Sequence, residues 1–314
     1  MSLVTATCAR APDDRLRIGG CTCSLWWSGT PRHPHHRVGA IGEIVASDAA
    51  ALTALLGRAC KRLAAQGCTL AIGPMDGTTW GRYRAVTGSP VAPPFFLEPQ
   101  NAPYLPACFE GAGFRIVARY VSAIEEPIAC APPPRSAALV RQAQERGIRT
   151  RALDTRDFHG ELRRLHGFCL AAFRSSFLFT PIDADRFVEI NAPLAPCIRP
   201  ELARVAEEDG RIVALLFALP DALEALRGAP PCTVIVKTIA TLPERRNEGL
   251  ARLLADEVAA NARALGFRRA IHALMHEANR SAAWSAKAAG VFRRYALFAR
   301  PLARPAAKSR HGPA

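Results

Sequence analysis

Residues 233–265 read TVIVKTIATLPERRNEGLARLLADEVAANARAL, and this stretch decides the fold of the second half of the chain. The apolar, β-branched run 233–241 predicts a strand, and the residues after Gly249 predict an amphipathic helix with one apolar face. A strand that enters a helix through a glycine turn directs free backbone N–H groups and the positive end of the helix dipole at one point. The stretch therefore predicts a grip for a phosphorylated cofactor.

The overall composition predicts a globular protein with room for two domains. The chain has 314 residues, of which 49% are hydrophobic and 22% are charged. Lys plus Arg number 41 against 27 acids, which gives a net charge of +14, and nearly all of this excess is arginine. A solvated basic surface, an anionic cofactor, an acidic substrate and nucleic acid all fit this charge. Because no dense basic block is interleaved with aromatics, charge alone does not choose among them.

Cysteine usage and the termini predict a soluble protein of a reducing cytoplasm. The ten cysteines form no regular disulfide framework, the N-terminus lacks the pattern of a signal peptide, and the longest apolar run (212–219) is too short to span a membrane. Cys21, Cys23, His33, His35 and His36 are metal-ligand types, but C-x-C on a strand points to opposite faces. We therefore expect a solvated loop here and no metal.

The first half reads as an alternation of strands and helices. We expect a hairpin over 12–28, a strand over 39–47 and a helix over 49–66 capped by Asp48. Strands over 68–74 and 114–124 follow, separated by a loop-rich stretch and a short helix that ends at Gly113. The prolines of 125–134 mark the seam between the halves.

The second half continues the alternation. The expected helices are 136–146, one starting at Asp154 or Thr155 and running to 173, 183–190, and one from Asn279 to Ala289. The expected strands are 147–153, 202–207, 211–219, 267–276 and 291–302. An Asp-Gly pair at 209–210 predicts a hairpin, and 304–314 reads as a frayed basic tail. The boundaries we expect are a first domain over 1–128, a linker with a connecting helix over 129–146, a second domain over 147–303 and a disordered tail over 304–314.

The two halves resemble each other. KRLAAQGCTLAIGPM (61–75) and NARALGFRRAIHALM (261–275) share a helix-glycine-strand pattern, and FEGAGFRIVARYV (109–121) matches AKAAGVFRRYALF (286–298). A repeat of this length predicts tandem copies of one α/β unit.

The second half resembles the GNAT superfamily of N-acetyltransferases. The family's acetyl-CoA signature is Arg or Gln, two residues, Gly, one residue, then Gly or Ala, which here is Arg246, Gly249 and Ala251. The strand before it, the helix after it and the later helix that starts at Asn279 follow the family's order. The resemblance implies an α/β fold (an α+β mixed sheet) of two tandem GNAT-like domains, each a mostly antiparallel twisted sheet flanked by helices.

The resemblance also implies where the donor, acetyl-CoA, binds. The strand backbone at Ile239, Ala240 and Thr241 is expected to pair with the pantetheine arm. The amides from Arg246 to Ala251 (Arg246, Asn247, Glu248, Gly249, Leu250 and Ala251) are expected to hold the pyrophosphate. Asn279 falls where family members often place an Asn against the pantetheine, and it is also an ordinary helix cap.

Acyl transfer to an amine requires a base, a donor for the oxyanion and an acid for the leaving thiolate. Many family members place a tyrosine seven residues after the Asn as the acid, and here that position is Ala286. Either the thiolate leaves without this acid, or Tyr295 replaces it, or the half binds the cofactor without transfer. For the base, His272 and His276 share strand parity and hence one face, followed by Glu277. His272 also fits a satisfied core histidine, so we choose His276 and Glu277.

The first half resembles the family in a degenerate form, because its first strand leads into its helix without the Arg or the glycine turn. We expect it to bind no cofactor and either to shape the acceptor site or to support the fold. The candidate acceptor-site residues, which packing also explains, are Trp80, Tyr83, Glu98, Asn101 and Tyr104.

The leading reading is an acetyl-CoA-dependent N-acyltransferase that moves an acetyl group to a small-molecule or peptide amine. One alternative is a catalytically silent acyl-CoA-binding or regulatory module. Another is an RNA-associated aminoacyl or acetyl transferase, which the predicted tandem domains and the net charge of +14 favour. In the leading reading we expect no membrane or nucleic-acid partner, and the sequence does not fix the oligomeric state, the acceptor or the acyl chain length.

Overall fold

The computed structural model describes residues 10–88, 92–129, 135–246, 248–279, 282, 285 and 289–303. The strands are β1 (Asp14–Ile18), β2 (Cys21–Trp26), β3 (Val38–Val45), β4 (Leu70–Gly73), β5 (Ala85–Thr87), β6 (Arg115–Glu125), β7 (Arg149–Ala152), β8 (Ala203–Glu208), β9 (Arg211–Pro220), β10 (Thr233–Thr241), β11 (Arg269–His276) and β12 (Gly290–Pro301). The helices are α1 (Ala49–Ala65), α2 (Leu105–Gly111), α3 (Arg135–Glu145), α4 (Phe158–Phe173), α5 (Ala184–Asn191), α6 (Ala222–Leu226) and α7 (Leu250–Ala264), with short 3-10 helices η1 (Ala192–Cys197), η2 (Pro200–Leu202) and η3 (Pro243–Arg245).

Local sequence signals set most of these boundaries. The Asp48 side chain caps α1, as predicted, and Asp209 and Gly210 both have positive φ in the β8–β9 hairpin. The helix α4 begins later than predicted, because Asp157 is its cap. Asp154 instead accepts hydrogen bonds from the backbone N–H groups of Arg156 and Asp157, which forms a turn before the helix. The predicted helix from Asn279 lies mostly outside the described residues, and the tail 304–314 lies wholly outside them.

The strands form one continuous mixed sheet in the order β1-β2-β3-β4-β12-β6-β11-β10-β9-β8-β7, with β5 beside β12. The pairs β3–β4 and β10–β11 are parallel, whereas the other pairs are antiparallel. The mixed α/β class and the mostly antiparallel pairing are confirmed. The expectation of one sheet for each half needs correction, since the strands of both halves join in a single sheet.

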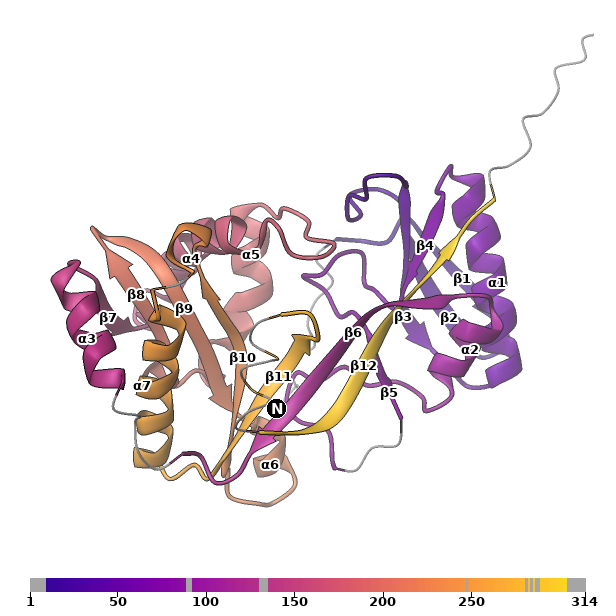
Figure 1. Ribbon diagram of the computed structural model, residues 1–314. Helices are drawn as coiled ribbons and strands as arrows, with labels where there is room; N and C mark the ends of the chain where they lie inside the picture. The colour runs from indigo at the N-terminus through magenta and orange to yellow at the C-terminus, as the bar shows by residue number, and fades with distance from the viewer. Residues whose placement is uncertain are drawn as a thin grey trace, which may run out of the picture.

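The joint consists of the last strand of each half (Figure 1). The strand β6 ends the first half but pairs with β11 of the second, and β12 ends the second half but pairs with β4 of the first. The two exchanged strands also pair with each other, and Tyr120 lies opposite Tyr295. A pseudo-twofold axis therefore passes near this pair, and it relates β3–β4 to β10–β11.

Helices cover the sheet in both halves. In the first half α1 and α2 pack together against a core that includes β2, β4 and the end of β12. In the second half α7 packs on β8, β9 and β10, whereas α4 packs on β9 and α5. Figure 1 shows α7 in front of these strands and α4 and α5 behind them. The predicted repeat of helix, glycine and strand is confirmed, because Gly67 and Gly266 both adopt positive φ between a helix and a strand.

Candidate functional site

The parallel strands β10 and β11 separate partway along their length. Their ladder begins at Thr233–Arg269 and ends at Val236–His272. Beyond it β10 follows β9 to Thr241, while β11 follows β6 to His276. A bulge at Lys237 on β10 and a register shift between His272 and Met275 on β11 drive the strands apart. We call the opening between residues 237–241 and 273–276 the strand wedge, and its inner end lies next to the last ladder pair.

A glycine turn and a helix N-terminus lie at the outer end of the strand wedge. Gly249 has φ +77, which favours glycine, and a Cβ on it would lie 2.4 Å from Cδ2 of Leu139, so that side chain would have to move. Among the described residues, which exclude Asn247, no side chain caps α7, whereas Asp48, Asp157 and Asp183 cap α1, α4 and α5. The first N–H groups of α7 are therefore available to an anion, which the helix dipole also favours.

The other residues predicted to bind the cofactor surround the same opening. Ile239, Ala240 and Thr241 are half-buried on the β10 side. Arg246 is exposed and donates to the hydroxyl of Ser175 over 3.4 Å, and Leu250 is buried in the core.

Of the four remaining predicted cofactor residues, three are described and one lies outside the described residues. Glu248 pairs with Arg146, which directly follows α3, and with Arg245 of η3, and these pairs fix the turn. Ala251 is half-buried in the first turn of α7. Asn279 is exposed just after β11, and its N–H donates to the carbonyl of His276. Asn247 lies outside the described residues.

The equivalent opening in the first half is closed by the chain itself. The β3–β4 ladder ends at Ala40–Ile72, and the N–H of Met75 then donates to the carbonyl of Ile41 over 2.8 Å. The N–H of Glu43 donates to the carboxylate of Asp76 over 2.6 Å. These bonds use the backbone groups that an extended ligand would need, which gives a physical reason for the expectation that the first half binds no cofactor.

The loop that closes this opening also brings Arg84 to the strand wedge. Arg84 is 7% exposed, and its guanidinium lies between the rings of Tyr83 and Tyr120, with Cζ 3.8 and 4.1 Å from their centroids. Its Nη1 donates to the carbonyl of Leu274 on β11 over 2.7 Å. Leu274 lies in the shifted part of β11 and has φ +57, which is rare for a residue other than glycine. The bond from Arg84 therefore ties this part of β11 to a residue of the first half.

The two predicted histidines face opposite sides of the sheet, which corrects the parity argument. His272 pairs with Ala123 and His276 with Tyr120, because the register shift inserts one residue into β11. His272 contacts Glu125 (Nε2 to Oε2, 3.3 Å) and Ser285 (Nδ1 to Oγ, 2.6 Å). His272 is thus the satisfied histidine that one reading of the sequence predicts.

His276 is placed to donate a hydrogen bond rather than to accept a proton. Its Nδ1 accepts the N–H of Ala278 over 3.1 Å, so the neutral ring carries its proton on Nε2. Burial, together with the charge of Arg84, lowers the pKa of His276, which favours this neutral form. Glu277 pairs with Arg294 over 3.3 Å, and its side chain is 38% exposed.

Tyr295 belongs to a buried network at the joint between the halves. Its hydroxyl donates to Glu98 and lies 3.0 Å from the hydroxyl of Ser122, which accepts the N–H of Leu274. Glu98 also faces Arg293 at 3.1 Å. Tyr295 is 1% exposed, and burial and the carboxylate of Glu98 raise its pKa. The network reaches the strand wedge only through Leu274, and the role of Tyr295 as an acid stays a prediction.

The predicted acceptor-site residues divide into two groups. Trp80 donates to the carbonyl of Thr180 over 2.7 Å and contacts Phe187, so it reaches the second half. Tyr83 stacks on Arg84, which in turn bonds Leu274 of the second half. Asn101 instead bonds the backbone of Val86 and Ala102, while Tyr104 packs against the core of the first half. These two therefore support the fold, and Glu98 lies beneath the site in the buried network.

Two basic residues near the strand wedge were missed by the sequence reasoning. Lys237 is an exposed charge within an apolar strand, and that interruption was the available signal. Arg84 carried no local signal, because its contacts with Leu274 and Tyr120 are made through the fold.

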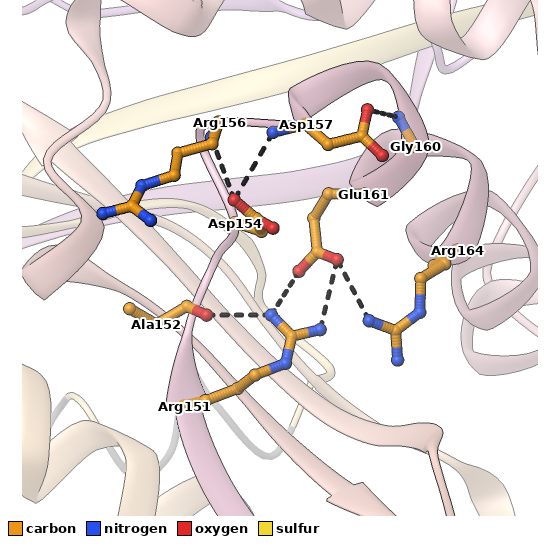
Figure 2. Close-up of a pocket in the computed structure, with 8 residues that line it drawn as sticks. All are labelled: Arg151, Ala152, Asp154, Arg156, Asp157, Gly160, Glu161 and Arg164. Carbon is orange, nitrogen blue, oxygen red and sulfur yellow. Dashed lines mark hydrogen bonds and ion pairs between the residues drawn. The ribbon is translucent and has the colours of Figure 1, made fainter.

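A separate pocket of about 510 Å³ lies between β7 and the start of α4 (Figure 2). Arg151 bonds both oxygens of Glu161 and one oxygen of Glu207, and Arg164 bonds the same two acids. Asp157 caps the helix. These ion pairs connect α4 to β7 and β8 at the edge of the sheet, and β7 lies three strands away from β10.

In the part of the chain that the structure describes, no group of three or more His, Cys, Asp or Glu is arranged to hold a metal ion. No helix among these residues is long and apolar enough to cross a membrane.

Fold and site together define a class of mixed α/β protein in which two parallel strands separate in front of an uncapped helix. Residues 173–290 match the model of the acetyltransferase (GNAT) family. The chain therefore contains a GNAT-family domain, as the resemblance implies. No match was found among curated protein sequences.

Solved structures with the same fold include other GNAT proteins. The glucosamine N-acetyltransferase region of a fungal multi-domain β-N-acetylglucosaminidase is 13% identical (TM-score 0.55), with 90% of this chain and 31% of that chain covered. A GCN5-related N-acetyltransferase from Sphaerobacter thermophilus is 14% identical (TM-score 0.51; 90% and 76% covered). A tandem GNAT protein of the clavulanic acid pathway is 13% identical (TM-score 0.52; 95% and 86% covered). At these identities the likeness concerns the fold alone.

Proposed function

We propose that this protein is an acetyl-CoA-dependent N-acyltransferase. The observation that carries the proposal is the strand wedge, which ends at an uncapped helix N-terminus behind the glycine turn. An extended pantetheine arm fits between the separated strands, with its amides against the free edge of β10. The pyrophosphate would then meet the N–H groups of Arg246 to Ala251.

In the proposed reaction a neutral amine attacks the thioester carbonyl. A C–N bond forms, the C–S bond breaks, the amine loses one proton and the CoA thiolate gains one. His276 is available as a donor through Nε2–H. Glu277, partly exposed at the end of β11, keeps the proposed role of base. No thiolate acid is assigned beyond the predicted Tyr295.

The binding step is tested by thermal unfolding with acetyl-CoA. We expect saturating acetyl-CoA to raise the melting temperature of the parent by a few degrees, because about 100 times Kd adds ~2.7 kcal/mol. Arg246→Glu places a carboxylate against the phosphates and removes most of that shift. The matched control is Arg115→Glu, an exposed site on β6 in the first half, which keeps it. An undiminished shift in Arg246→Glu rejects this assignment.

A second candidate is an acyl-CoA-binding module without transfer. The observation that favours it is the state of the predicted catalytic groups, since Tyr295 is sealed from solvent and Nδ1 of His276 is already bonded. Ala286 also stands where many family members have a tyrosine, and it lies outside the described residues. Release of free CoA on addition of an amine panel separates the two candidates. Binding with no release by any amine supports the silent module.

A further inference from the structure

The strand wedge holds a group of hydrogen-bond donors that the cofactor site does not use. The donors are the guanidinium of Arg84, the ammonium of Lys237 and Nε2 of His276. Arg84 bonds the carbonyl of Leu274, two residues beyond the last ladder pair, and Lys237 directly follows that pair on the opposite strand. His276 lies farther along β11, and its ring is 5.0 Å from that of Tyr120, on which Arg84 stacks. The three donors therefore line one opening.

Arg84 presents an open edge. Its printed contacts are the Nη1 bond to Leu274 and the two tyrosine rings. Its Nε and Nη2 have no acceptor among the described residues. Neither nitrogen belongs to the polar atoms that are buried without a hydrogen-bond partner, so both are accessible to solvent. These two nitrogens form one side of the guanidinium fork, whose geometry matches the two oxygens of a carboxylate. The rings of Tyr83 and Tyr120 hold the fork in place.

Lys237 and His276 respond to the positive charge of Arg84. Desolvation by the surrounding protein, together with that charge, lowers the pKa of Lys237, although part of its side chain is exposed to solvent. Burial and the same charge lower the pKa of His276. An anion placed among these groups would relieve the repulsion that Arg84 exerts on both.

The acids near these donors are engaged elsewhere. Glu277 pairs with Arg294, Glu125 with His272, and the buried Glu98 with Arg293. Within the described residues neither Arg84 nor Lys237 forms an ion pair with a carboxylate. The strand wedge thus carries uncompensated positive charge, part of it on the rigid, buried Arg84.

We propose that Arg84, with Lys237 and His276, binds the carboxylate of the acceptor, so that the acceptor is an amine that also carries a carboxyl group. This inference rests on the proposed function. The site is distinct from the pyrophosphate site, because the four residue steps of extended β10 from Lys237 to Thr241 separate them by about 13 Å. An α-amino acid would place its carboxylate on Arg84 and its amine beside the thioester at the inner end.

The test compares each α-amino acid with its carboxamide, which keeps the amine and removes the negative charge. The readouts are kcat/KM for acetylation and, independently, saturation-transfer NMR binding to the CoA-loaded protein. We expect acids to be preferred over their amides. Arg84→Gln should reduce this preference roughly tenfold or more, because a charge-assisted bond is lost. Lys237→Gln, at an exposed position, should reduce it less and guards against misfolding of the first variant.

Arg17→Gln is the control, since it removes an exposed arginine from β1. Acetyl-CoA melting shifts are recorded for every variant, so that a failed donor site is distinguished from a failed acceptor site. With the donor shift intact, equal use and binding of acid and amide overturn the inference. A preference for acids over amides that is unchanged in both site variants also overturns the inference. A preference for phosphate-bearing amines such as phosphoethanolamine does the same.

Discussion

At the scale of single residues, backbone conformation decides where the site forms. Gly249 has positive φ, and a Cβ on it would displace the side chain of Leu139, so both features favour glycine. Leu274 has positive φ without being glycine, and two bonds hold it there: Arg84 to its carbonyl and its N–H to Ser122. The site thus depends on local geometry that packing from both halves maintains.

Gly249→Ala should damage both stability and cofactor binding. The positive φ alone costs about 1–2 kcal/mol for a residue with a Cβ, and the 2.4 Å contact forces Leu139 or the turn to move. The control is Gly147→Ala, where φ is +73 and nothing lies within 4 Å of the added Cβ. Urea unfolding should show the larger loss for Gly249→Ala, which should also lose the acetyl-CoA shift. Equal losses and an intact shift in both variants would contradict the role of the turn.

Residue roles were the hardest feature to predict from the sequence. The glycine turn was found, because it follows a strand and opens a helix with a recognisable pattern. The histidine faces were wrong, because parity assumes a regular pleat and one inserted residue reverses every later side chain. Arg84 was missed, since its partners lie far away in sequence.

At the scale of elements, the two halves use one strand pair in two ways. In the second half β10 and β11 separate and leave an opening, whereas in the first half Met75 and Asp76 fill the space beyond β3 and β4. Asp48 also caps α1, so that helix has no free N-terminus to offer. The same folding unit is therefore open once and closed once.

This difference predicts one acyl-CoA site per chain. Isothermal titration with CoA should give a stoichiometry of one. Asp76→Ala removes the carboxylate that accepts from Glu43 and Arg82, and it should cost about 1–3 kcal/mol of stability without adding a second site, because the bond from Met75 remains. Two equivalents bound to the parent chain would contradict the closed state of the first half.

The sequence predicted most of the helices and strands, but it did not predict the register in which the strands pair. Alternation, caps and glycines located the strands and long helices, since these signals are local. The small strand β5 and helix α6 were not predicted. Both are short, and partners far away in sequence fix them: β12 pairs with β5, and Asp221 at the start of α6 bonds the N–H of Phe96.

At the scale of the whole molecule, the exchanged strands make the halves one folding unit. The strand β12 belongs to the second half by sequence, yet β4 and β6 flank it. No sequence pattern shows such an exchange, because the two strands that change places have similar lengths (11 and 12 residues) and similar patterns of buried and exposed residues. This is why two separate sheets were expected.

Removal of β12 should therefore loosen both halves. A chain that ends at residue 289 leaves the edges of β4 and β6 unpaired, and we expect faster amide hydrogen exchange in β4 and in β11, which pairs with β6. A chain that ends at residue 303 keeps β12 and serves as the control. Loosening confined to one half would show that the halves are independent.

A reciprocal strand exchange about a twofold axis is also the geometry of a domain-swapped dimer. Here Tyr120 and Tyr295 face each other near that axis, within a single polypeptide. The molecule therefore has the form of a swapped dimer within one polypeptide. In a true homodimer the two subunits are identical by necessity, whereas here the two halves differ in sequence. One half can therefore contribute Arg84 to an opening that only the other half forms.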